Sequence, residues 1–127
     1  MSKIQGKCRE VFDKAEWVAV ATAGKEGPHL VATWGDYIRT LDTEDDKILV
    51  PVSGYRITEQ NFLTDNRIEI LIATRQVPGA HGPGKGCRIH GTGQIQTSGD
   101  AAEGAKKKFP WARGVLVIKA EEVLEQL

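Results

Sequence analysis

The chain has no excess of either charge, since 17 of its 127 residues are Lys or Arg and 17 are Asp or Glu. Without a net charge it has no long-range field that would attract nucleic acid or an anionic membrane, so we expect it to bind neither. No apolar run approaches the roughly 20 residues that a membrane-spanning helix needs. Residues 1–7 form a polar opening without the apolar core of a signal peptide, which predicts a cytoplasmic protein.

Cysteine is also scarce. Cys8 and Cys87 are the only two, and neither lies in a C-x-x-C motif or beside a histidine at ligand spacing. This pattern excludes the common zinc signatures and predicts that the protein has no metal site. Cys8 falls on the apolar face of a predicted helix and Cys87 opens a predicted strand. Both are therefore interpreted as small buried side chains in a reducing compartment, with no redox role.

Glycine is plentiful, and its 14 residues cluster at predicted turns, a pattern typical of β-rich folds. The length predicts one domain spanning residues 1–127. Periodicity predicts helices at 3–15, 58–65 and 100–108, and extended segments at 17–22, 29–34, 37–41, 47–52, 67–74, 88–97 and 114–120. The acidic run 42–46 is predicted to be a solvent turn, and the Pro- and Gly-rich run 75–86 a long loop. The predicted fold is mainly β, a small antiparallel barrel with short accessory helices.

The most informative segment is 54–63, which follows the strand-like run 48–52 through Ser53 and Gly54 into a short helix. Gly54 allows a tight turn, Thr58 is predicted to cap the helix, and the first helical N–H groups are unpaired. Arg56 adds a fixed positive charge. These features predict a site for a phosphorylated ligand. An ordinary strand–turn–helix joint, in which Thr58 only caps and Arg56 is solvated, stays open as the alternative.

Other residues with useful chemistry give weaker signals. The three histidines are scattered, and no catalytic acid, base or nucleophile stands out. The glycine-rich run 82–86 lacks the spacing of a nucleotide-binding phosphate loop. Trp34, Tyr37 and Trp111 could stack on an extended π surface or could simply belong to the core.

A series of short motifs, each occurring once, follows in order along nearly the whole chain, from about Trp17 onward. They are Ala21-Thr22, Gly27-Pro28-His29-Leu30-Val31, Thr33-Trp34, Tyr37, Val50-Pro51-Val52, Thr58-Glu59, Asn61, Gly82-Pro83-Gly84, Gly86, Ile89, Gly91 and Trp111-Ala112-Arg113. Together they resemble the FMN-binding split-barrel family, which includes the pyridoxamine 5'-phosphate oxidases and small bacterial FMN-binding proteins. The resemblance implies a six-stranded antiparallel split β-barrel with short flanking helices. It also implies a homodimer whose interface holds FMN non-covalently.

By position, the resemblance implies that the strand around Thr33 and the turn 53–58 hold the phosphate and ribityl side of FMN. The isoalloxazine ring would lie near the three aromatic residues, and Leu127 would reach the partner's flavin. Arg75 is a weaker candidate that could meet the phosphate, the N1/C2 edge of the flavin, or solvent. The implied cofactor-binding residues are Ala32, Thr33, Trp34, Tyr37, Val50, Pro51, Val52, Ser53, Gly54, Arg56, Thr58, Arg75, Trp111 and Leu127.

One departure from the family concerns the phosphate. The family commonly has Lys or Arg where this chain has Ile57 or Thr58, so Arg56 would have to supply the positive charge from one residue earlier. If Arg56 cannot reach, FMN would bind weakly.

The resemblance favours an electron-transfer protein or a small flavin oxidoreductase, with an unidentified electron donor and acceptor. The longer substrate-binding pattern of the pyridoxamine phosphate oxidases is not visible here, and whether the chain is an enzyme stays open. The alternatives are a non-enzymatic split-barrel module that binds haem or a deazaflavin, and a dimer whose flavin site has decayed.

Overall fold

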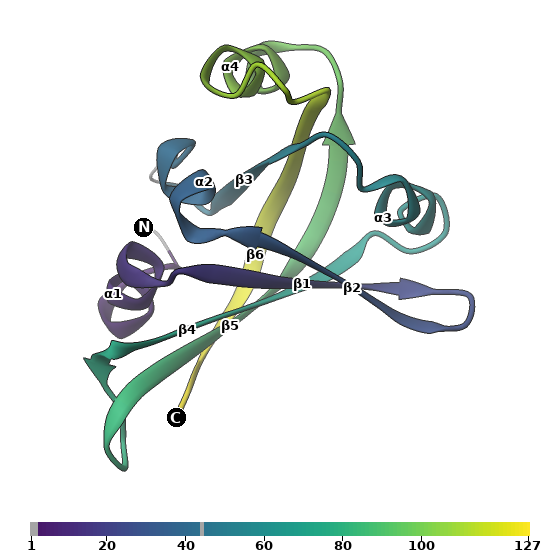
Figure 1. Ribbon diagram of the computed structural model, residues 1–127. Helices are drawn as coiled ribbons and strands as arrows, with labels where there is room; N and C mark the ends of the chain where they lie inside the picture. The colour runs from purple at the N-terminus through teal and green to yellow at the C-terminus, as the bar shows by residue number, and fades with distance from the viewer. Residues whose placement is uncertain (1–2, 44) are drawn as a thin grey trace.

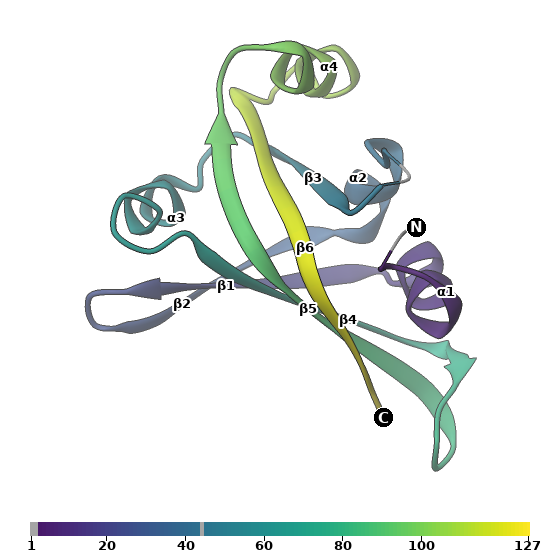
Figure 2. The ribbon, with the colours of Figure 1, turned by 180° about the vertical axis from the view of Figure 1, so that it is seen from behind.

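The computed structural model describes residues 3–43 and 45–127; Met1, Ser2 and Glu44, the last of which belongs to the predicted acidic turn, lie outside the described residues. The strands are β1 (Trp17–Gly24), β2 (Gly27–Trp34), β3 (Lys47–Val52), β4 (Arg67–Pro78), β5 (Pro83–Gln96) and β6 (Gly114–Gln126). The helices are α1 (Gly6–Lys14), α2 (Gly35–Thr40), α3 (Arg56–Asn61) and α4 (Asp100–Lys108). The strands form one antiparallel sheet in the order β2-β1-β4-β5-β6-β3, which curls as Figures 1 and 2 show.

The inner face of the curled sheet carries the core. Along β1 and β4, buried Val18, Val20, Ile70 and Ile72 alternate with more exposed residues, as expected for strands with one buried face. Helix α1 adds apolar side chains to the same cluster, including Phe12. A smaller cluster joins α4 to β3 and β6; its buried members are Leu41, Leu49, Ala102, Ala105 and Val115.

The mainly β class and the six-stranded split barrel are confirmed, but two local predictions were wrong. Residues 37–41 are not extended, because Gly35–Thr40 form α2. Residues 75–86 are not a long loop, because β4 continues to Pro78 and β5 begins at Pro83. Prolines at the two strand ends pair across a short hairpin, and Gly82 and Gly84 take positive φ angles that other residues rarely adopt.

The interpretation of the cysteines as independent thiols was also wrong. Both are buried, as expected, but Cys8 of α1 and Cys87 of β5 form a disulfide, with their Cα atoms 5.5 Å apart. Spacing alone could not predict this pairing, because the two residues are 79 positions apart in sequence. The bond fastens α1 to the sheet.

In the ranges 3–43 and 45–127, no group of three or more His, Cys, Asp or Glu side chains is placed to hold a metal ion. Within the same ranges, no helix has the length and apolar character needed to cross a membrane.

Candidate functional site

The turn at 53–56, between β3 and α3, contains the most unusual backbone conformation at the site. Tyr55 has φ 63° and ψ 33°, in the left-handed region that is rare for a bulky side chain. Such a conformation costs about 1–3 kcal/mol, and residues of this kind concentrate at functional sites. The sequence predicted that Gly54 would make the tight turn, but Gly54 does not have a positive φ angle. The strained position is Tyr55, to which the sequence pattern assigned no role.

Side chains from two other segments hold this turn. The Tyr55 hydroxyl donates a hydrogen bond to the carbonyl of Ala32 on β2, at 2.9 Å. Arg113 donates two hydrogen bonds to the Gly54 carbonyl, from Nε at 3.1 Å and from Nη2 at 2.7 Å. The backbone N–H of Arg113 also donates to the Val52 carbonyl at 2.8 Å. The turn is therefore fastened both to the edge strand β2 and to the segment that leads into β6.

The charged groups around the turn give it a net positive charge. The side chain of Arg56 is 70% exposed, and its Nη1 lies 4.0 Å from Oε1 of Glu59. The same Glu59 oxygen accepts a hydrogen bond from Nη2 of Arg113 at 2.9 Å, and the Arg113 side chain is only 17% exposed. Two guanidinium groups and one carboxylate leave a charge of +1 beside the turn.

Thr58 does not cap α3, so this prediction was wrong. The helix begins at Arg56 after Tyr55, and within the described part of the chain no side chain caps its first turn. Thr58 lies inside the helix and is fully buried, and its hydroxyl has no hydrogen-bond partner among the described residues. An unpaired buried hydroxyl lowers the stability of a protein by about 1–3 kcal/mol, so a hydrogen bond to this hydroxyl would be favourable.

The predicted residues of β3 lie beneath the turn. Val50 and Val52 are fully buried and belong to the barrel core, and Pro51 is also buried. Their side chains face away from solvent, and any contact they make with a ligand would come through backbone atoms. Ser53 and Gly54 are exposed at the end of the strand.

Aromatic side chains gather next to the turn. The rings of Tyr37, Phe109 and Trp111 form a triangle with centroid distances of 5.0, 5.6 and 5.5 Å and tilted planes. Trp34, which is half-exposed, lines a hollow of about 520 Å³ together with Tyr37. The structure thus places the three predicted ring-contacting residues in one neighbourhood. Phe109 was missed because its sequence, Phe-Pro-Trp, indicated only a helix break.

Helix α2 holds Trp34 and Tyr37 in position. Arg39 donates from Nη1 to the carbonyls of Phe12 at 3.0 Å and Ala15 at 2.7 Å, at the end of α1. Gly35 packs directly against the Ala15 carbonyl, where a side chain would clash. These contacts explain why residues with strand propensity form a helix here, because tertiary contacts override a weak local preference.

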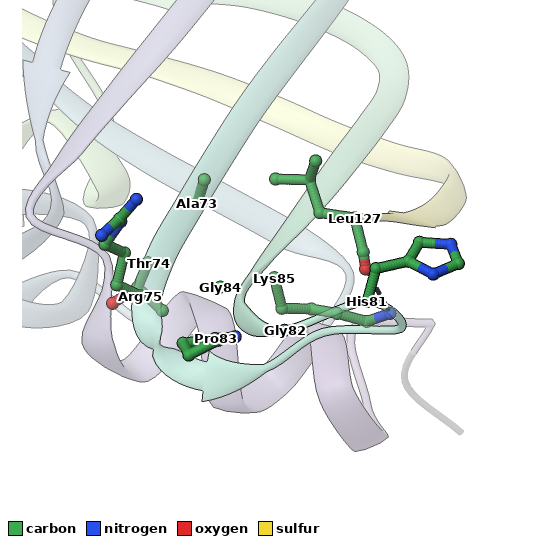
Figure 3. Close-up of a pocket in the computed structure, with 9 residues that line it drawn as sticks. All are labelled: Ala73, Thr74, Arg75, His81, Gly82, Pro83, Gly84, Lys85 and Leu127. Carbon is green, nitrogen blue, oxygen red and sulfur yellow. Dashed lines mark hydrogen bonds between the residues drawn. The ribbon is translucent and has the colours of Figure 1, made fainter.

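The remaining predicted residues, Arg75 and Leu127, lie elsewhere in the protomer. They line a hollow of about 490 Å³ at the β4–β5 hairpin, where the Leu127 carbonyl accepts hydrogen bonds from Ala80 N at 2.9 Å and Lys85 Nζ at 3.3 Å. In Figure 3 the Arg75 guanidinium points away from the imidazole of His81. Figures 1 and 2 place this hairpin and α3 at opposite ends of the sheet. One protomer therefore does not bring Arg75 and Leu127 to the turn at 53–56.

The side of the sheet that faces away from the core carries an apolar surface. We call it the outer face; its apolar members include Trp17, Ala19, Ala21, Leu30, Ala32, Trp34, Leu71 and Leu124. In one cross-strand row, Ala32, Ala19, Leu71, Arg88 and Leu124 lie side by side on five successive strands. Oε1 of Glu69 lies 2.7 Å from Nη2 of Arg88 and accepts a hydrogen bond from its Nε at 2.8 Å. Nδ1 of His90 lies 3.5 Å from the same oxygen. A patch of this kind is typical of a protein interface.

The Tyr55 phenol is expected to make stability depend on pH at high pH. Burial raises the pKa of Tyr55 above its ordinary 10.0, and a smaller effect of a hydrogen bond with Thr33 lowers it. Because the folded state favours the neutral phenol, Tyr55 contributes to the free energy of unfolding. The contribution is complete below pH 10 and is lost as the pH rises through the raised pKa.

We therefore expect Tyr55→Phe to be less stable than the wild type by about 1 kcal/mol at pH 7, because it lacks the hydrogen bond to Ala32. The difference should shrink above pH 10, where ionisation penalises only the wild type. Urea unfolding between pH 7 and 11 measures this, with Tyr37→Phe as the control. A difference that stays constant over this pH range would contradict the assignment.

The fold and the site define the class of this protein. An antiparallel sheet whose end strands β2 and β3 stay apart is a split β-barrel, and the net positive turn beside aromatic side chains is a candidate binding site on its rim. The family model for pyridoxamine 5'-phosphate oxidase matches residues 4–127. The chain belongs to the pyridoxamine 5'-phosphate oxidase family.

Individual relatives agree with this membership. The FMN-binding protein of Nitratidesulfovibrio vulgaris (strain DSM 19637 / Miyazaki F) is 41% identical over 124 residues, which cover 95% of this chain and 99% of that protein. The crystal structure of HupZ from Group A Streptococcus matches with a TM-score of 0.70 and 23% identity, over 92% of this chain and 91% of that one. An FMN-binding protein from Syntrophomonas wolfei matches with a TM-score of 0.66 and 14% identity, over 95% and 84% of the two chains. At these identities, the two crystal structures show the shared fold.

Proposed function

We propose that this protein binds FMN non-covalently, with the phosphate at the turn 53–56 and the isoalloxazine ring beside Trp34, Tyr37 and Trp111. The observation that carries the proposal is that the turn 53–56 and the aromatic cluster are connected through the segment 111–113. Arg113 binds the turn, and Trp111, two residues earlier, contacts Tyr37, so a net positive turn and an aromatic cluster are neighbours. A ligand with a phosphate at one end and a flat ring at the other fits this pair. The 41% identical relative, named an FMN-binding protein, supports the choice of FMN.

The unpaired Thr58 hydroxyl agrees with a ligand at the turn. It lies two residues after Arg56, on the first turn of α3, and a bound group close to it would supply the hydrogen-bond partner that it lacks among the described residues. The phosphate would contact Arg56 and the backbone of Ser53 and Gly54. The side chains of Val50 and Val52 would support the turn from the core.

We further propose that the protein is a homodimer with its flavins at the interface. The hollow lined by Arg75 and Leu127 and the turn at 53–56 lie at opposite ends of the protomer. Two protomers packed through their apolar outer faces with a two-fold axis could bring one hollow to the partner's turn. Arg75 and Leu127 would then complete the partner's flavin site.

Within this arrangement the protein would serve as an electron-transfer protein or a small flavin oxidoreductase. The bound flavin would accept electrons and pass them on, and the protein would supply orientation and charge. Trp34, Tyr37 and Trp111 would hold the ring plane, and Arg56 would hold the phosphate. The electron donor and acceptor would meet the flavin at the rim of the barrel.

The visible absorption spectrum of the purified protein tests FMN binding directly. We expect the spectrum of an oxidised flavin and expect chromatography of the heat-released chromophore to identify FMN. A colourless protein that also fails to bind added FMN would contradict the proposal.

Arg56→Ala tests where the phosphate binds. We expect the Kd for FMN to rise about 10- to 100-fold, because a charge-assisted contact of about 1.5–3 kcal/mol is lost. The Kd for riboflavin, which has no phosphate, should change little. Quenching of flavin fluorescence measures both constants. Lys7→Ala on α1 is the control, since it removes one positive charge away from the turn, and an unchanged FMN affinity in Arg56→Ala would contradict the role of Arg56.

A further inference from the structure

Arg113 lies at the centre of the contacts around the turn 53–56. Its guanidinium makes three hydrogen bonds, two to the Gly54 carbonyl at 2.7 and 3.1 Å and one to Glu59 at 2.9 Å. With a side chain only 17% exposed, it is far less accessible than Arg56. Arg113 is therefore poorly placed to be the main ligand of a phosphate, and its contacts point to a different role.

The first part of that role concerns the backbone. The peptide bond between Gly54 and Tyr55 is trans, so the Tyr55 N–H points to the side opposite the Gly54 carbonyl. Because Arg113 holds that carbonyl, the N–H is directed away from Arg113. The same contact supports Tyr55 in its left-handed conformation, which is otherwise unfavourable. Loss of the guanidinium would free the turn to relax.

The second part concerns charge. Glu59 lies between two guanidinium groups, 2.9 Å from Arg113 and 4.0 Å from Arg56. Without Arg113, the Glu59 carboxylate would pair with Arg56 alone and would repel an anion at the turn. With Arg113 present, Glu59 is neutralised from the buried side and Arg56 keeps its charge for a ligand.

We propose that Arg113 is a positioning residue that makes the site prefer a phosphorylated flavin over an unphosphorylated one. It shapes the turn, screens Glu59, and links the turn to Trp111 two residues away. The ligand class it selects is a phosphate monoester. This inference rests on the proposed function, since it assumes that the turn binds the phosphate of FMN.

The test compares the Kd values of FMN and riboflavin in the wild type and three variants. In Arg113→Ala, we expect FMN binding to weaken about 10- to 100-fold, because the Glu59 carboxylate loses its hydrogen bond from Arg113 and repels the phosphate. Riboflavin binding should weaken less than about 3-fold. In Glu59→Gln, FMN should bind about 3- to 10-fold more tightly, with riboflavin unchanged. In Arg113→Ala/Glu59→Gln, much of the lost FMN affinity should return, because the unscreened carboxylate is gone. A purely structural role of Arg113 would not predict this rescue.

Other outcomes would overturn the inference. Equal losses of FMN and riboflavin in Arg113→Ala would mean that Arg113 only supports the fold, and an absence of rescue in the double variant would exclude the screening of Glu59. If Arg113→Ala does not fold, the Glu59→Gln result decides alone, and an FMN affinity that does not rise would contradict the proposal. A wild-type protein that binds neither FMN nor riboflavin would contradict the proposed function itself. The wild-type measurement shows this before any variant is made.

Discussion

Removing the disulfide between Cys8 and Cys87 is expected to lower the free energy of unfolding by about 4.5 kcal/mol. The bond closes a loop across a sequence separation of 79 residues, and a cross-link of that length restricts the unfolded chain by about this amount in the chain-entropy model. Urea unfolding of the wild type and of Cys8→Ala/Cys87→Ala measures the effect.

The single variants provide the control for this prediction. If the two residues form one bond, Cys8→Ala, Cys87→Ala and the double variant should all lose a similar amount, because each breaks the same cross-link. If they were separate buried thiols, the two losses would add. Mass spectrometry after alkylation gives a second test, since two alkyl groups should be added only after the unfolded protein is reduced. Alkylation of both cysteines without reduction would contradict the bond.

The position of the disulfide connects it to the proposed flavin site through α1. Helix α1 provides the Phe12 and Ala15 carbonyls that hold Arg39, and Arg39 lies on α2 with Tyr37. Loosening α1 should therefore disturb the aromatic cluster as well as the core. In a reducing compartment the same pair would exist as buried thiols, and α1 would depend on packing alone.

The elements that could be predicted from the sequence are those whose local pattern agrees with their final surroundings. Helix α4 was predicted with its observed bounds, Asp100–Lys108, because acidic residues begin it, three lysines end it, and Phe-Pro-Trp stops it. Strand β3 was predicted equally well from its apolar run. Both depend on neighbours in the sequence.

The wrong predictions share a dependence on distant contacts. Helix α2 forms because the end of α1 binds Arg39, which residues 37–41 do not reveal by themselves. Strand β4 continues past Thr74 because β5 pairs with it despite the glycines and prolines between them. The disulfide joins residues that only the folded sheet brings together.

The candidate site divides in the same way. Resemblance pointed to Trp34, Tyr37 and Trp111, which the structure brings near one another. It could not reveal Tyr55 as the strained residue, because a Tyr in the sequence does not predict a positive φ angle. It implied that Leu127 reaches the partner's flavin but could not show that Arg75 shares a hollow with Leu127 at the end of the sheet opposite the turn 53–56, the observation that favours a two-subunit site.

The second large effect is expected from Leu71→Glu, which should separate the proposed dimer and release FMN together. Leu71 lies in the middle of the outer face between Ala19 and Arg88, and it is 43% exposed in the protomer, so a Glu there should be tolerated by the fold. Arg88 is already engaged by Glu69 and offers the new carboxylate little compensation. In a two-fold dimer through this face, two carboxylates would be buried, each at a cost of several kcal/mol. The dimer Kd should rise about a thousand-fold or more.

Analytical ultracentrifugation with detection at flavin wavelengths measures dimer dissociation and FMN release in one experiment, because it reports the mass of the species that carries the flavin. Leu63→Glu is the matched control: Leu63 is 84% exposed, follows α3, and is not part of the outer face, so this variant should stay dimeric and keep FMN. A Leu71→Glu dimer that still holds FMN would place the interface on another surface. A Leu71→Glu monomer that keeps FMN with wild-type affinity would mean that one protomer suffices, and that Arg75 and Leu127 have no part in the flavin site. Loss of dimer and flavin at the same protein concentration is the outcome that a shared site requires, because each flavin would then depend on residues from both protomers.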